Sequence, residues 1–459
     1  GKHGPADGDH IHLTIDEVIQ HVAEEALGKA MSHWSAKSGS VVVLDPRDGA
    51  ILALASSPTF DPNAFGDHPP AFWRNRPVQD LYEPGSTFKI VTAAAGLEEG
   101  LVTPSQIIDC GSGGIEIAGT RIREHNGQQY GHISFEDVLV HSSNVGTIRV
   151  GLSLGAQRFY EYVTRFGFGS RTGVDLPGEG SGILRPTRQW SMLSNAVISI
   201  GQEIAATPLQ MAQALAVVAN GGMLVQPHVL HHIENGSGEG VSAFTPPPPR
   251  RVVSDRSAAV LNEMLKAVVV RGTGRNAALT NYAVAGKTGT AQKAERGRYA
   301  PNKSVASFGG YVPADRPRLV ILVVIDEPRG GQYGGTVAAP VFREIAEQAL
   351  RYLRVPPSSP ARNLPLRRLE LATFSQSHAA GGSIVKGIVP DLRGLDERAA
   401  LAHATRLGIR VAVRGEGLVR TQQPAAGEPY DGSRTVELAL SPERQLLQPG
   451  DEEVMEKGI

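Results

Sequence analysis

A serine and a lysine one helical turn apart are the first candidates for chemistry in this sequence. Residues 83–89 are Glu-Pro-Gly-Ser-Thr-Phe-Lys, and an apolar, helix-compatible run follows them. The Pro-Gly pair predicts that a helix begins at Ser86, which places Lys89 on the same helical face. A serine hydroxyl is a weak nucleophile unless an adjacent base takes its proton, and a lysine can be that base only if its pKa is lowered. Burial and a second cation both lower a lysine pKa, so the pair raises the question of where another cation lies.

Two later motifs offer the remaining parts of a serine acyl-transfer site, which needs a nucleophile, a base, a proton relay and donors for an oxyanion. Ser142 and Asn144 present a hydroxyl and an amide two residues apart, so one strand or turn can aim both the same way. Lys287 is the candidate second cation. The three motifs in this order, behind a Pro-Gly helix start, favour one combined site over a chance match.

Small and hydroxylated residues surround Lys287. Gly286 and Gly289 let a strand edge approach a substrate closely and leave backbone N–H groups free. Thr288 and Thr290 add hydroxyl groups suited to a carboxylate. The segment therefore predicts a strand edge that binds substrate.

Composition limits the alternatives. A chain of 459 residues is too long for one ordinary core, so two or three domains are expected. The formal net charge of −1, from 45 basic and 46 acidic residues, gives no indication of a nucleic-acid partner. Cys110 is the only cysteine, which excludes an intrachain disulfide. The longest strongly apolar run, residues 319–325, is too short to span a bilayer, and no signal peptide is visible.

The order of predicted elements favours an α/β or α+β fold. Hydrophobic periodicity and turn residues first predict an amphipathic helix after a capping-box spacing at 14–17, then a hairpin at 41–44 and 50–55, and then the Ser86 helix. Further along the chain they predict a helix from Thr207-Pro208 to 220–222, strands at 307–312 and 319–325, and a helix at 339–353. Both hairpin strands are nearly all apolar, as in the centre of a covered sheet. Residues 56–76 and 235–251 are expected to be loops.

A change in composition at Val355 predicts a second, smaller module. Residues 355–382 are rich in Pro, Ser, Arg and Gly and indicate a linker. The module beyond it is predicted to contain a strand or turn at 386–392, a helix at 396–407, a turn at 422–424, and strands at 409–413 and 435–440. Residues 451–459 are charged and are expected to be disordered.

The three motifs resemble S-x-x-K, S-x-N and K-T-G of the serine penicillin-recognising enzymes. Further segments are similar to class B penicillin-binding proteins, the D,D-transpeptidases that cross-link peptidoglycan, at residues 13–16, 42–57, 82–89 and 325–328. This similarity runs from about residue 13 to residue 353. The module from about residue 383 to 441 resembles a PASTA domain, through Val-Pro-Asp-Leu at 389–392 and Gln-Pro-Ala-Ala-Gly at 423–427.

The resemblance implies a fold and a domain division. The fold would be that of the penicillin-recognising transpeptidases, a central, mostly antiparallel sheet flanked by helices with an all-helical subdomain, followed by a small αβββ PASTA-like module. The implied division is a transpeptidase domain at 1–354, a linker at 355–382, a PASTA-like domain at 383–442 and a charged tail at 443–459.

The resemblance also implies catalytic roles. Ser86 would attack the penultimate D-Ala carbonyl of a stem peptide and form an acyl-enzyme, releasing the terminal D-Ala. Lys89 would be its base, and Ser142 and Lys287 would pass a proton to the leaving amine. An amine of a neighbouring stem peptide would then take the acyl group. No cofactor and no metal ion is expected.

Binding roles are implied for the residues beside these four. Asn144 would bind the substrate amide, and Thr288, Gly289 and Thr290 would form the edge that holds the terminal carboxylate, or that of a β-lactam. The backbone N–H groups of Ser86 and Thr290 would form the oxyanion hole.

The resemblance extends to partners and location. The expected partners are peptidoglycan stem peptides, β-lactam antibiotics, a glycosyltransferase and proteins of the divisome or elongasome, with no nucleic acid. The expected location is the outer face of the bacterial cytoplasmic membrane. The anchor would precede Gly1, so the sequence is expected to be a truncated one.

Two other classes of function stay open. The first is a β-lactamase or D,D-carboxypeptidase that hydrolyses its acyl-enzyme, although the PASTA-like module favours a wall synthase. The second is a penicillin-sensing receptor or an inactive wall scaffold. Three intact motifs argue against inactivity.

Weaker signals are interpreted as structural. A second S-x-x-K at 383–386 is taken as accidental, and Cys110 has no histidine partner in view. Five histidines near apolar segments are expected to be solvated rather than metal ligands, because no ligand spacing connects them: His10, His12, His228, His231 and His232. Glu203 lies where relatives often carry glycine, which questions the shape of that loop but not the chemistry.

Overall fold

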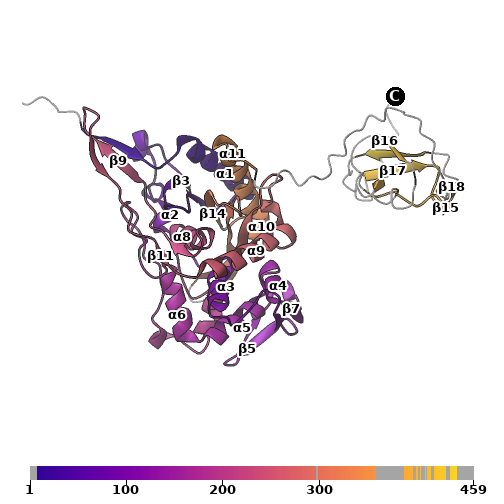
Figure 1. Cartoon of the computed structure of the whole chain (residues 1–459), viewed down its shortest axis with the longest axis horizontal. Helices are drawn as coiled ribbons and strands as arrows, with labels where there is room; N and C mark the ends of the chain where they lie inside the picture. The colour runs from indigo at the N-terminus through magenta and orange to yellow at the C-terminus, as the bar shows by residue number, and fades with distance from the viewer. Residues whose placement is uncertain are drawn as a thin grey trace, which may run out of the picture. The chain divides into compact units, whose positions relative to one another are not determined.

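We describe a computed structural model of the chain, which defines residues 8–295, 298–357, 387–395, 400–401, 404, 409, 411–414, 418–430 and 435–441. The chain divides into two compact units, Gly1–Leu366 and Arg367–Ile459, shown in Figure 1 and described separately below. Apart from residues 355–357, the predicted linker and the predicted tail lie outside the described residues, as does most of the predicted helix at 396–407.

A five-stranded antiparallel sheet forms the centre of the main unit. Its strands are, in spatial order, β12 (Ala285–Glu295), β13 (Arg298–Val312), β14 (Leu319–Asp326), β2 (Ser38–Leu44) and β3 (Ile51–Ser57). The inner strands β14 and β2 are buried almost throughout, as their apolar sequences predict. The prediction of a central position is wrong for β3, which lies at the edge and alternates buried with partly exposed residues.

Helices cover both faces of this sheet. On one face, α1 (Glu17–Trp34) and α11 (Ala339–Tyr352) lie side by side, as Figure 1 shows, and their apolar sides share one core with Phe308 and Val323 of the sheet. On the other face, α8 (Pro208–Ala219) packs against β2, β13 and β14 and also against α9 (Asp255–Arg271). Because it is covered on both sides, α8 is buried along nearly its whole length. The predicted helices at 207–220 and 339–353 are confirmed.

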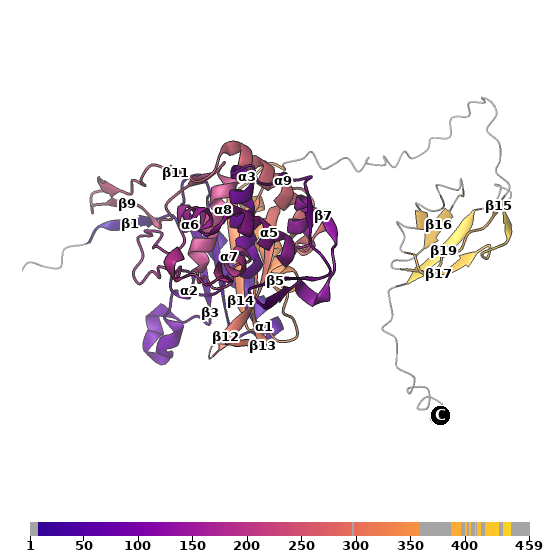
Figure 2. The same cartoon turned by 90° about the horizontal axis from the view of Figure 1, so that it is seen from below.

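A helical subdomain follows α3 (Lys89–Glu98). Its helices are α4 (Phe135–Val140), α5 (Asn144–Leu154), α6 (Ala156–Arg165) and α7 (Ser194–Ser199). Figure 2, which views the structure from below, shows α5 and α7 in front of the sheet. The subdomain also carries two small antiparallel sheets, which pair β4 (Ile107–Asp109) with β7 (His132–Ser134) and β5 (Gly114–Ile117) with β6 (Thr120–Arg123). It is therefore not purely helical, because the polar stretch before α4 folds back on itself.

Of the two predicted helix starts with caps, one forms a capping box in the structure and the other does not. Thr207 and Gln210 form a complete capping box at the start of α8. The capping box predicted at residues 14–17 is wrong, because Asp16 caps α1 by accepting hydrogen bonds from Val18 N and Ile19 N. The Thr14 hydroxyl donates instead to the carbonyls of Ile51 and His228 and joins distant segments.

Several short elements complete the main unit. A small antiparallel sheet contains β1 (His10–Leu13), β9 (Leu230–Glu234) and β10 (Gly240–Ala243), and β8 (Met223–Leu224) pairs with β11 (Arg250–Arg251). The predicted loop at 235–251 therefore contains two short strands. The predicted loop at 56–76 contains the 3₁₀ helices η1 (Pro62–Asp67) and η2 (Pro70–Phe72), and α2 (Arg76–Gln79) follows. Of the described helices, none has the length and hydropathy needed to cross a bilayer.

The second unit has its own small core. β16 (Val411–Arg414), β19 (Val436–Ser441) and β17 (Leu418–Gln423) form one sheet in that order, and β15 (Gly387–Ile388) pairs with β18 (Pro429–Tyr430). The predicted strands at 409–413 and 435–440 correspond to β16 and β19. Residues 400, 401 and 404 are helical, and Ala400 and Ala404 pack against Val419, Val436 and Leu438.

The central sheet predicts a sharp contrast between two valine substitutions. Val323 on β14 is fully buried, whereas Val270 on α9 is 74% exposed. Val323→Ala should lower the free energy of unfolding of the main unit by about 2–3 kcal/mol, because a buried cavity replaces two methyl groups. Val270→Ala should change it by less than about 0.5 kcal/mol. Urea unfolding followed by fluorescence measures both, and equal values would contradict the assigned core.

Candidate active site

Ser86 lies in a 3₁₀ turn, Gly85–Phe88 (η3), that runs directly into α3. The turn is fixed from both sides: the Thr87 hydroxyl donates to the Pro84 carbonyl at 2.7 Å, and Gly85 N donates to the Gly201 carbonyl at 2.9 Å. The Ser86 side chain is only partly buried. The predicted helix start is therefore confirmed, and the hydroxyl lies at its amino end.

Lys89 is fully buried, and its amine points to the second motif. Its Nζ donates to Ser142 O at 2.7 Å, to Ser142 Oγ at 3.3 Å and to Asn144 Oδ1 at 2.8 Å. Burial lowers the pKa of Lys89 to about 7, against the opposing negative charge of Glu124. A large fraction of this amine is therefore neutral near pH 7 and able to accept a proton.

Ser142 and Asn144 lie in a tight turn between α4 and α5, not on a strand. Ser142 has a left-handed backbone, with φ of 59°, which directs its side chain toward the two lysines. Asn144 is the first residue of α5, and its Nδ2 donates to Arg123 O at 2.9 Å. That bond fixes the amide so that Oδ1 faces Lys89.

The carboxylate of Glu124 fixes this turn by hydrogen bonds. Glu124 is 4% exposed, and its carboxylate accepts hydrogen bonds from the Ser143 hydroxyl, from Asn144 N at 2.6 Å and from Val145 N at 3.2 Å. A carboxylate at the amino end of α5 satisfies amides that the helix itself leaves unpaired. Glu124 is thus a positioning residue for the S-x-N turn.

Lys287 comes from β12 on the opposite side of the site. It is fully buried, and its Nζ donates to Ser142 Oγ at 2.9 Å and to Thr288 O at 3.2 Å. Burial, followed by the nearby charge of Lys89, lowers the pKa of Lys287 well below its ordinary value. The structure therefore places Ser142 Oγ between two amines, and Lys287 is the second basic group that the sequence predicted.

The edge of β12 lies directly against the Ser86 turn. A Cβ atom on Gly289 would lie 3.1 Å from Pro84 O and 2.2 Å from Ser307 Oγ, so only glycine allows this approach. Thr288 Oγ1 pairs with Thr273 Oγ1 at 2.7 Å, and Thr290 Oγ1 accepts from Gly334 N at 3.3 Å. Among the strands that the structure describes, β12 pairs with β13 alone, so its other edge is open.

All of the predicted site residues are thus brought together, from three separate parts of the fold. Ser86 and Lys89 come from η3 and α3, Ser142 and Asn144 from the α4–α5 turn, and 287–290 from an edge strand. The arrangement provides a hydroxyl at a helix start, a buried amine with a lowered pKa, and a relay of hydroxyl and amine. These are the groups that serine acyl transfer needs.

Sequence reasoning missed Glu124 and its neighbour His125. The His125 residue is exposed, and the partial desolvation of its ring together with the charge of Lys89 lowers its pKa, which places it close to the site. Its ring contacts Tyr333 edge-on, with 5.1 Å between the ring centroids. Neither residue has a local signal, because both lie in a polar, glycine-rich stretch. A helix start leaves backbone N–H groups unpaired, so a helix beginning at Asn144 is the one indication that an acceptor such as Glu124 is needed there.

The comparisons with known proteins agree with this site. The Penicillin binding protein transpeptidase domain matches residues 39–347, and the PASTA domain matches residues 387–442. This chain belongs to the penicillin-binding protein transpeptidase family.

Individual penicillin-binding proteins and their relatives show the extent of the similarity. Stage V sporulation protein D of Bacillus subtilis is 34% identical over 96% of this chain and 66% of its own length. Penicillin-binding protein PbpB of Mycolicibacterium smegmatis is 38% identical over 77% of this chain and 56% of its own length. The chain thus spans less than two thirds of either relative.

Solved structures show the same fold. Penicillin-binding protein 3 of Mycobacterium tuberculosis, in its apo form, superposes with a TM-score of 0.73 at 34% identity, over 78% of this chain and 83% of that one. The same protein complexed with aztreonam gives a TM-score of 0.72. The predicted penicillin-recognising transpeptidase fold is confirmed.

The lowered pKa of Lys89 predicts how acylation depends on pH. If Lys89 is the base, only its neutral form accepts the Ser86 proton, so the reactive fraction falls as pH drops below about 7. The second-order rate constant for acylation by a fluorescent penicillin should fall about tenfold per pH unit on the acid side and level off above the midpoint. A rate independent of pH across this range would exclude Lys89 as the base.

Glu124→Gln tests the positioning of the turn. The amide offers one acceptor oxygen in place of two, so a buried donor of the turn loses its partner, and the plateau acylation rate should fall about tenfold. Because the charge of Glu124 raises the pKa of Lys89, its loss should also move the pH midpoint toward acid.

Glu116→Gln is the matched control, because Glu116 is exposed on β5. It should leave both the plateau and the midpoint unchanged. A Glu124→Gln protein with an unshifted midpoint would show that Glu124 does not act on Lys89.

Proposed function

We propose that this chain is the catalytic part of a peptidoglycan D,D-transpeptidase that cross-links stem peptides through a Ser86 acyl-enzyme. The observation that carries the proposal is the position of Ser142 Oγ, which accepts hydrogen bonds from the buried amines of both Lys89 and Lys287. Such a relay can take a proton from one side of the reacting carbon and deliver it to the other.

Acylation would proceed in two proton transfers. Ser86 Oγ attacks the carbonyl of the penultimate D-Ala while neutral Lys89 accepts its proton, which gives a tetrahedral oxyanion. As the peptide bond breaks, the proton held by Lys89 passes through Ser142 Oγ and the Lys287 amine to the departing amine, and the terminal D-Ala leaves. An acceptor amine of a second stem peptide then attacks the ester and restores the Ser86 hydroxyl.

The open edge of β12 would bind and orient the substrate. An extended peptide can add to this edge as a further strand, with the Asn144 amide on its other side. Backbone N–H groups of Ser86 and Thr290 would stabilise the oxyanion, where each donor contributes about 10²–10³ in rate. Thr288 and Thr290 would hold the terminal carboxylate, and Gly289 keeps the edge close to Ser86. A β-lactam would enter the same way and acylate Ser86 with its leaving group still attached.

The domain division belongs to this proposal. We assign residues 1–354 to the transpeptidase domain, 355–382 to a linker, 383–442 to a PASTA-like domain and 443–459 to a tail. We place the enzyme at the outer face of the bacterial cytoplasmic membrane, with an anchor, a glycosyltransferase and division or elongation proteins as partners. This location would be contradicted if a fusion protein that contains this chain showed transpeptidase activity only when it is retained in the cytoplasm.

Intact-mass spectrometry with benzylpenicillin tests the central claim. The chain should gain the mass of one drug molecule, and Ser86→Ala should gain none, because the nucleophile is gone. Ser142→Ala should still be acylated, but about 10²–10⁴ times more slowly, because the relay is broken. Ser153→Ala, an exposed serine on α5, is the control and should react like the parent chain.

Other outcomes point to the competing functions. Rapid drug hydrolysis with no lasting adduct would identify a β-lactamase. A stable adduct in a chain that never joins donor and acceptor stem peptides would identify a sensor, and release of D-Ala without joining would identify a carboxypeptidase. A folded chain that does not react would be a scaffold.

A further inference from the structure

Two strands distant from the active site place imidazole and carboxylate groups on one face. β1 carries His-Ile-His and β9 ends in His-Ile-Glu. In the antiparallel register His12 lies directly opposite His232, and His10 lies opposite Glu234. Because side chains alternate along a strand and directly paired residues share a face, all four project from the same side of this ribbon.

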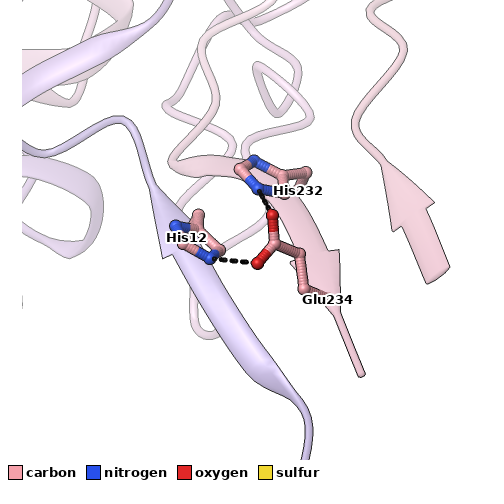
Figure 3. A group of neighbouring side chains, drawn as sticks. All are labelled: His12, His232 and Glu234. Atoms are coloured by element: carbon pink, nitrogen blue, oxygen red, sulfur yellow. Dashed lines mark hydrogen bonds and ion pairs between the residues drawn. The ribbon is translucent and has the colours of Figure 1, made fainter. Parts of the chain in front are cut away.

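Three of these side chains already converge, as Figure 3 shows. The Glu234 carboxylate lies beside the Nε2 edges of both rings, with Oε2 3.3 Å from His12 Nε2 and Oε1 3.0 Å from His232 Nε2. The two rings stack with 4.1 Å between their centroids and an interplanar angle of 7°. One potential ligand atom from each residue lies within 4.8 Å of the others.

The spacing matches that of a small divalent ion. A tetrahedral zinc ion bound at about 2.0–2.1 Å holds neighbouring ligand atoms roughly 3.3 Å apart. The two stacked imidazoles would rotate away from their parallel arrangement so that both Nε2 atoms face the ion. The donor set of imidazole nitrogens and one carboxylate oxygen is one that Zn²⁺ prefers. Within the described residues, the ion pairs of Glu234 are with these two histidines, so no lysine or arginine occupies the place of the ion.

A neighbouring residue orients His232. His231 occupies a bulge in β9, where the register with β1 shifts, and its Nδ1 lies 2.6 Å from His232 Nδ1. This contact occupies one ring nitrogen of His232 and leaves Nε2 for an ion, which is the role of an outer-shell partner in known metal sites. The exposed His10, on the same face, or a water molecule can supply a fourth ligand.

We propose that His12, His232 and Glu234 form a zinc site that clips β1 to β9. The consequence is structural, because β1 leads through Thr14 into α1, the helix that covers one face of the catalytic sheet. Thr14 already joins this segment to Ile51 and His228 by hydrogen bonds. The ion would add a side-chain attachment to the strand pairing and hydrogen bonds that already join these segments. From the sequence, His12 and His232 were expected to be solvated, because these ligands come together only through strand pairing.

Zinc titration of the metal-free chain tests the site. Isothermal calorimetry with zinc chloride should give one ion per chain, and saturating zinc should raise Tm by about a few degrees. His12→Ala, His232→Ala and Glu234→Gln should each weaken binding by at least about tenfold to a hundredfold and abolish the shift in Tm. His21→Ala removes an exposed histidine of α1 outside the cluster and should change neither.

Benzylpenicillin acylation serves as the folding control for every variant. The acylation rate should be the same with and without zinc, because the site holds none of the catalytic groups. The proposal is overturned if the acylating parent chain binds no zinc, or if His21→Ala weakens binding as much as His12→Ala. It is also overturned if one ion binds per two chains with dimer formation in sedimentation, since the ion would then join copies rather than strands.

Discussion

The burial of two amines around one serine hydroxyl is the constraint on which the rest of the site depends. Lys89 and Lys287 are both fully buried, and a buried ammonium without a counter-ion is strongly disfavoured. The fold resolves this conflict by lowering both pKa values and by giving each amine oxygen acceptors from Ser142. Burial thus favours the neutral form of both amines, and the same two amines are the groups that move protons.

This constraint explains why three unrelated segments must meet with little tolerance. The S-x-N turn is fixed by Glu124, whose carboxylate bonds to three consecutive residues and also opposes the fall in the Lys89 pKa. On the other side, Gly289 lets β12 approach the Ser86 turn to a distance that any side chain would block. Glu124 therefore influences the charge of Lys89, and Gly289 sets the distance between β12 and the Ser86 turn.

Local chemistry decided what the sequence could predict. The Ser86 helix start, the helix start at Thr207-Pro208 and the apolar strands follow from neighbours in the chain, and the fold has them where predicted. The errors arise where tertiary contacts override local pattern. Thr14 bonds to the distant residues Ile51 and His228 rather than capping α1. Strand β3 lies at an edge despite its apolar sequence, and Glu124 meets the S-x-N turn only after folding.

Glu203 shows how the loop beside the Ser86 turn accommodates a side chain at a left-handed position. Its φ of 60° lies in the left-handed region, where a side chain costs about 1–2 kcal/mol relative to glycine. The ion pair of its carboxylate with Arg185 offsets part of this cost. Its backbone N–H donates to Glu83 Oε1 at 2.9 Å, a bond that glycine would make as well. Gly201 in the same loop has no such freedom, because a Cβ atom there would lie 2.1 Å from Gly85 O. The loop therefore keeps glycine where it touches the Ser86 turn and accepts a side chain two residues away, which leaves the nucleophile in place.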